Sequence, residues 1–71
     1  MTPHGWHRYD GAWILMRGGV QIARVECAGR RWRWTCGTSS ALAPGAVSAM
    51  EAVDRLIHRR AVLAARRGEA A

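Results

Sequence analysis

The stretch AWILMRGGVQIARVEC, residues 12–27, contains two apolar runs separated by a pair of glycines. Gly18-Gly19 is typical of a two-residue hairpin turn, because the primed turn types need positive φ angles that glycine adopts freely. We therefore expect antiparallel strands at residues 12–17 and 20–27. The apolar positions change phase between Ile22 and Ala23, which predicts a β-bulge or a strand with two partly buried faces.

The next segments predict one more strand and a helix. Residues 31–36, RWRWTC, alternate strictly and indicate a third strand after a turn at residues 28–30. Residues 37–46, GTSSALAPGA, have the composition of a loop. Ser48 and Glu51 form a capping box, so we expect a helix from Ala49 to about Arg66. Its inner stripe is predicted at Met50, Val53, Leu56, Ile57, Ala61 and Ala64.

The predicted fold is therefore α+β, a three-stranded antiparallel β-meander followed by one long α-helix packed on the sheet. We expect residues 1–11 to be a flexible lead-in, residues 12–67 to form the single domain, and residues 68–71 to be a disordered tail.

One helix can cover only one face of such a sheet. Pairing of the three predicted strands across turns at Gly18-Gly19 and Gly29 places the following side chains on one face: Trp13, Leu15, Val20, Ile22, Trp32, Trp34 and Cys36. The other face is predicted to carry Arg31, Arg33 and Thr35 beside an apolar group: Ile14, Met16, Ala23, Val25 and Cys27. Burial of a large apolar side chain contributes about 1.5 to 3 kcal/mol, so we expect the helix on the indole face. The alternative leaves Trp32 and Trp34 exposed as a platform for bases.

Charge indicates the class of partner. The 71-residue chain has a formal charge of +6, and its 11 basic residues are all arginine. A net positive field favours an anionic partner, either nucleic acid or an acidic protein surface. Guanidinium groups also bind phosphate in a bidentate manner and stack on aromatic rings.

Few residues in the sequence suggest catalysis or metal binding. His4 and His7, with Cys27 and Cys36, invite a zinc interpretation, but the predicted pairing separates the two cysteines by about 13 to 17 Å at strand rise. This separation is also too large for a disulfide between Cys27 and Cys36. The carboxylates are scattered, and the sequence lacks a phosphate loop and a nucleophile elbow. We expect no enzyme activity, metal or cofactor.

Location follows from what the sequence lacks. No apolar run approaches the roughly 20 residues that span a bilayer, and the N-terminal residues show no signal-peptide pattern. We expect no membrane partner and a cytoplasmic protein of a host bacterial cell, with both thiols reduced.

The order of AWILMRGGVQIARVECAGRRWRWTC, residues 12–36, followed by a loop and SAMEAVDRLI, resembles two groups of proteins. One is the three-stranded DNA-binding domain of phage integrase arms and plant ethylene-response factors, and this resemblance implies DNA contacts by Arg17, Arg24, Arg31 and Arg33. In size and architecture the chain also resembles short stand-alone proteins of phages and mobile elements, including anti-CRISPR inhibitors. That resemblance implies a small domain that occupies a surface on a host nucleoprotein complex.

The leading functional expectation is a non-catalytic, anti-CRISPR-like inhibitor that binds and blocks a host protein or nucleoprotein complex. The alternative is a domain that binds DNA or RNA directly through its arginine-rich sheet. A third hypothesis is a homodimer in which two copies bury each other's uncovered sheet faces. The expected partner-binding residues are Ile14, Met16, Arg17, Arg30, Arg31, Arg33, Arg55, Arg59 and Arg66.

Overall fold

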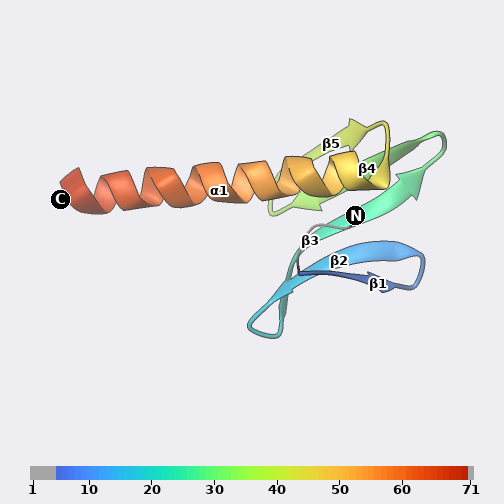
Figure 1. Ribbon diagram of the computed structural model, residues 1–71, viewed down its shortest axis with the longest axis horizontal. Helices are drawn as coiled ribbons and strands as arrows, with labels where there is room; N and C mark the ends of the chain where they lie inside the picture. Colours follow the sequence, from blue (N-terminus) through green and yellow to red (C-terminus); the bar gives the residue numbers. More distant parts are fainter. Residues whose placement is uncertain (1–4, 71) are drawn as a thin grey trace.

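The computed structural model describes residues 5–70, and within this range the side chains of residues 5–68. Five strands precede one long helix: β1 (Trp6–Tyr9), β2 (Ala12–Arg17), β3 (Val20–Ala28), β4 (Arg31–Cys36), β5 (Ser39–Ala43) and α1 (Ala46–Ala70) (Figure 1). The strands form one antiparallel sheet in the order β1-β2-β3-β4-β5. The α+β class is confirmed, whereas the predicted number of strands, three, is wrong.

Two-residue turns connect all the strands, and two of these turns account for the missed strands. Asp10 and Gly11 have φ angles of 50° and 77°, as a type I′ turn requires, and Asp-Gly is a strong hairpin signal. Gly37, with φ of 62°, begins the turn between β4 and β5. The predicted flexible lead-in therefore contains β1, and the predicted loop at residues 37–46 contains β5.

A β-bulge in β3 determines which side chains face the helix. Leu15 pairs with Ala23, but the next residue, Met16, pairs with Gln21, so Ile22 is the extra residue. The bulge predicted at this phase change is confirmed. Its consequence was predicted wrongly, because the shift turns Ala23, Val25 and Cys27 toward the indole side of the sheet.

The core lies between this side of the sheet and the first half of α1. Val25 is 0% exposed and pairs with Trp13 on one neighbouring strand and with Trp34 on the other. Trp32 and Trp34 are half-buried against the core, so the helix covers the indole face as predicted. The alternative of a free indole platform is wrong. The buried core residues are Trp6, Leu15, Ala23, Val25, Cys36, Ala43, Ala49, Met50 and Val53.

The helix begins earlier and ends later than predicted. The Ala49 amide donates to the Gly45 carbonyl at 3.0 Å, so Gly45 occupies the N-cap position and Ser48 lies within the first turn. The capping-box prediction is therefore wrong. The buried or half-buried positions Met50, Val53, Leu56 and Ile57 confirm the first part of the predicted stripe.

The second half of α1 extends past the sheet (Figure 1). Arg60 is at the border: its Nη2 donates to Ser39 Oγ at 2.9 Å, and its Nη1 lies 4.0 Å from Cys36 Sγ. Every described side chain after it is exposed, including Ala61 and Ala64, which were predicted to face the sheet. We call residues 61–68 the helix overhang.

Two leucines test this division. Leu15 is 2% exposed in the core, whereas Leu63 in the helix overhang is 45% exposed. Leu15→Ala should reduce the free energy of unfolding by about 2 to 5 kcal/mol, a large part of what so small a domain possesses. The matched control Leu63→Ala should change it by less than about 0.5 kcal/mol. Urea unfolding followed by tryptophan fluorescence measures both, and equal losses would contradict the described core.

Candidate binding surfaces

The sheet face opposite α1 has no element over it among the described residues, and we call it the uncovered face. One row of paired residues crosses it from edge to edge: His7, Ile14, Arg24, Thr35 and Ser40. Side chains two positions along each strand share this face. They add Tyr9, Met16, Glu26, Arg31, Arg33 and Leu42. Gln21 joins this face across the bulge, as the partner of Met16.

The charge of the uncovered face is positive. Arg24 and Arg33 flank Glu26, since Arg24 lies two residues away on β3 and Arg33 is the paired residue on β4. Arg24 Nε lies 3.4 Å from Glu26 Oε2, the one salt bridge found among the described residues. Both side chains are more than 40% exposed, so the pair contributes little stability. Arg24 is half-buried beside Glu26, while Arg31 and Arg33 are exposed.

A groove lies at the β1–β2 end of the uncovered face. It has a volume of about 330 Å³ and is lined by His7, Arg8, Tyr9, Ile14, Met16 and Gln21. Ile14 is 6% exposed and Tyr9 is 72% exposed, so the groove has an apolar floor and an aromatic rim. Arg8 lies at the sheet edge, where its guanidinium carbon is 5.5 Å from the centroid of the Trp13 ring.

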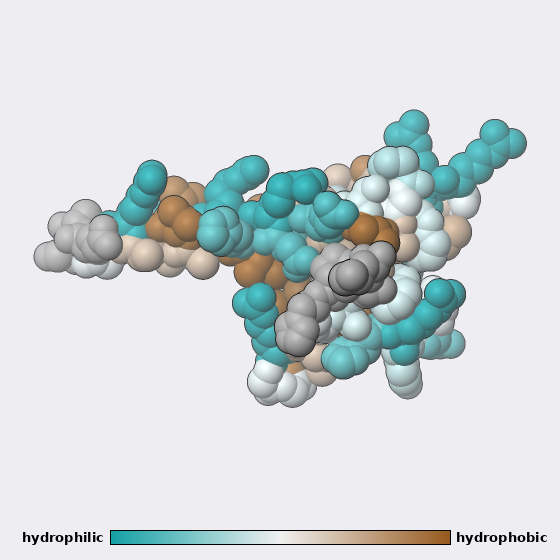
Figure 2. Space-filling view, in the orientation of Figure 1, coloured by the Kyte–Doolittle hydropathy of each residue, from teal (hydrophilic) through white to brown (hydrophobic). Residues whose placement is uncertain are grey.

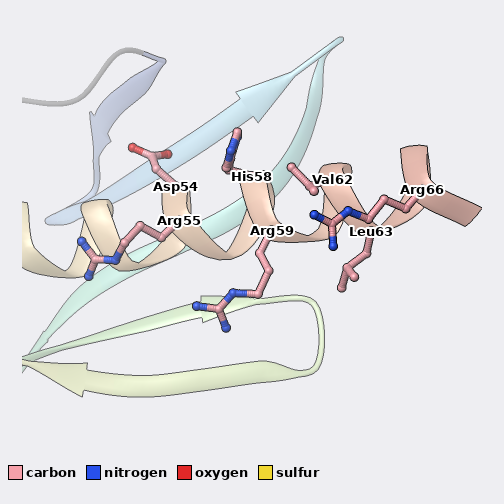
Figure 3. Close-up of a pocket in the computed structure, with 7 residues that line it drawn as sticks. All are labelled: Asp54, Arg55, His58, Arg59, Val62, Leu63 and Arg66. Atoms are coloured by element: carbon pink, nitrogen blue, oxygen red, sulfur yellow. The ribbon is translucent and has the colours of Figure 1, made fainter.

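A larger hollow, of about 610 Å³, follows α1 on the other side of the sheet. All seven of its lining residues belong to the helix, and Figure 3 shows Asp54, His58 and Val62 on one side of it and Arg55, Arg59 and Leu63 on the other. Because no second element of the described residues forms an opposite wall, this hollow suits a macromolecular surface better than a small molecule. Figure 2 shows apolar atoms between hydrophilic side chains along this part of the helix.

The predicted partner-binding residues fall on two separate surfaces. Ile14, Met16, Arg31 and Arg33 lie on the uncovered face, and Arg30 lies in the adjoining β3–β4 turn. Arg55, Arg59 and Arg66 line the helix hollow. Arg17 ends β2 on the helix side, where it lines a hollow with Asp54, Ile57, His58 and Ala61. A single flat ligand cannot contact both groups at once.

Sequence reasoning missed the contribution of β1 to the uncovered face. His7 and Tyr9 join this face only because β1 pairs with β2, and His7 lies opposite Ile14. The signal that could have revealed them is Asp10-Gly11.

The cysteines do not form a joint site. Both are free: Cys36 is buried, while Cys27 is exposed and its Sγ lies 3.4 Å from the Gly29 carbonyl oxygen. Within residues 5–68, no three side chains of the His, Cys, Asp and Glu types gather in a metal-binding cluster. His4 lies outside the described residues.

Two further findings bear on function. The described part of the chain contains no helix that is long and apolar enough to cross a membrane. Comparisons of the chain with protein-family models, curated proteins and solved structures found no match.

Proposed function

We propose that the protein is a non-catalytic nucleic-acid-binding protein that contacts phosphates through its uncovered face. The observation that carries this proposal is the presence of Arg24, Arg31 and Arg33 on one side of the sheet against a single carboxylate, Glu26. Most protein–nucleic acid hydrogen bonds go to phosphate and sugar, and arginine is well suited to them.

The spacing of these groups supports phosphate contacts. Arg33 is the diagonal neighbour of Arg24, since Arg24 pairs with Thr35, two residues farther along β4. Diagonal neighbours lie about 7 to 8 Å apart, so the two guanidinium groups can contact separate phosphates. Thr35 and Ser40 are paired across β4 and β5, and their hydroxyls can donate hydrogen bonds to the phosphates of the same nucleic-acid strand.

The bulge weakens the case for a protein partner on this face. It moves Ala23 and Val25 into the core, so the predicted apolar patch is reduced to Ile14 and Met16. The positive charge of this face also disfavours the homodimer considered above, because a two-fold contact would bring the arginines of both copies together.

A double variant tests the phosphate contacts. Arg31→Ala with Arg33→Ala should lower affinity for a short duplex DNA by about one order of magnitude per lost contact at about 0.1 M salt. The slope of log affinity against log salt should fall by about 0.9 for each contact. Fluorescence anisotropy across a salt series measures both quantities.

The matched control removes the same charge from the far end of α1. Arg66→Ala with Arg67→Ala should leave the affinity within about threefold, because these side chains lie on a separate surface and solvent ions screen distant charges. Equal losses in the two double variants would reduce the effect to net charge and contradict a site on the uncovered face.

A protein or nucleoprotein partner is a second candidate, and the helix hollow favours it. Val62 and Leu63 are exposed there between Arg59 and Arg66, and exposed apolar groups rimmed by charge commonly form protein interfaces. An anti-CRISPR-like inhibitor would use this surface to occupy a host complex.

Pull-down from a nuclease-treated bacterial lysate tests this candidate. Val62→Ser with Leu63→Ser should abolish capture of a protein partner while leaving thermal stability unchanged, since neither side chain is in the core. The Arg31→Ala, Arg33→Ala variant should capture the partner as the unaltered protein does. Failure of the unaltered protein to capture any partner would overturn this second candidate.

A further inference from the structure

We propose that the uncovered face prefers single-stranded nucleic acid and that the groove at the β1–β2 end of this face receives one unstacked base. This inference rests on the proposed function and specifies its ligand. The base would stack against Tyr9, over the floor formed by Ile14, while its phosphates contact the arginines.

The placement of the aromatic side chains is the first argument. The chain has four tryptophans, one tyrosine and no phenylalanine. The tryptophans are all in the core or packed against it, whereas Tyr9 is 72% exposed. Tyr9, the one Trp, Tyr or Phe side chain outside this core, therefore stands on the rim of a groove, on the same face as the arginines.

The shape and polarity of the groove are the second argument. Its apolar floor at Ile14 and its side wall at Met16 suit the flat surface of a base. His7 and Gln21 also line it, and their ring nitrogens and amide group can form hydrogen bonds with the edge of a base. Exposed bases of single strands are recognised by this combination of aromatic stacking and edge contacts.

The continuity between the groove and the arginines is the third argument. Ile14 pairs directly with Arg24, so the groove floor and the first arginine are on adjacent strands. Neighbouring strands are about 4.8 Å apart, and a base in the groove therefore leaves its own phosphate within reach of Arg24. Arg33 follows on the next strand, and the path continues across the sheet.

This arrangement discriminates against duplexes. In a duplex the base faces are stacked and the pairing edges are occupied, so a base enters the groove only after it has been unpaired and unstacked. A duplex can still contact Arg24, Arg31 and Arg33 through its phosphates. We therefore expect the groove to add affinity for single strands alone.

Tyr9→Leu is the test, measured by fluorescence anisotropy on one short mixed-sequence DNA, single-stranded or annealed to its complement. The single-strand affinity should fall about five- to hundredfold, because one base–aromatic stack is lost. The duplex affinity and the salt slopes should stay unchanged, since no phosphate contact is removed. The matched control Tyr9→Phe keeps the ring and should bind the single strand nearly as the unaltered protein does.

The outcomes separate this inference from the function on which it rests. Unchanged single-strand affinity in Tyr9→Leu, with loss in the Arg31→Ala, Arg33→Ala variant, would overturn the groove and leave the phosphate site in place. Equal losses on single strand and duplex would also overturn it, because a fold or charge effect acts on both. Absence of binding to either DNA by the unaltered protein would overturn the proposed function itself. Thermal melting of each variant establishes that the sheet is intact.

Discussion

The packing of Val25 between Trp13 and Trp34 beneath the helix is the contact on which the rest of the structure depends. It requires the extra residue at Ile22, because without that residue β3 would present Arg24 and Glu26 to the indoles and Val25 to water. Buried charges without partners are far more costly than a single unpaired residue in a ladder. The bulge thus produces both the apolar core and, on the opposite face, the charged surface. The same residue shift that stabilises the domain supplies its binding face.

The parts of the fold that were predictable depend on local patterns. Gly18-Gly19 specifies a turn by backbone conformation alone, and the alternation of residues 31–36 specifies a strand with its indoles on one side. The helix positions from Met50 to Ile57 follow from their spacing. In contrast, four of the five residues of β5 are small, Ser39, Ser40, Ala41 and Ala43, and have little strand preference of their own. It is a strand because β4 provides a partner for its backbone, and this tertiary effect is absent from the local sequence.

The candidate site was predictable in composition but not in arrangement. The arginines are evident in the sequence, and Arg31 and Arg33 were assigned to the correct face from alternation. Their separation from Arg55, Arg59 and Arg66 depends on the path of α1 over the other side of the sheet. Tyr9 could not be assigned to this site, because the pairing of β1 with β2 was not predicted. The position of the bulge could be inferred from the change of phase, whereas the face of Val25 was missed because the side chains of β3 were assigned by regular alternation, without the extra residue.

The helix overhang gives the molecule two regions of unequal cooperativity. Up to Arg60, α1 unfolds together with the sheet, because its side chains share the core and a hydrogen bond to Ser39. Beyond Arg60 the helix has only its own backbone hydrogen bonds, and isolated helices shorter than about 12 to 15 residues are marginal in water. The amide hydrogens of this segment therefore exchange with solvent through local fraying, without global unfolding. A ligand that contacts the overhang must order it and lose part of its binding free energy, whereas a ligand on the sheet meets a surface that is already fixed.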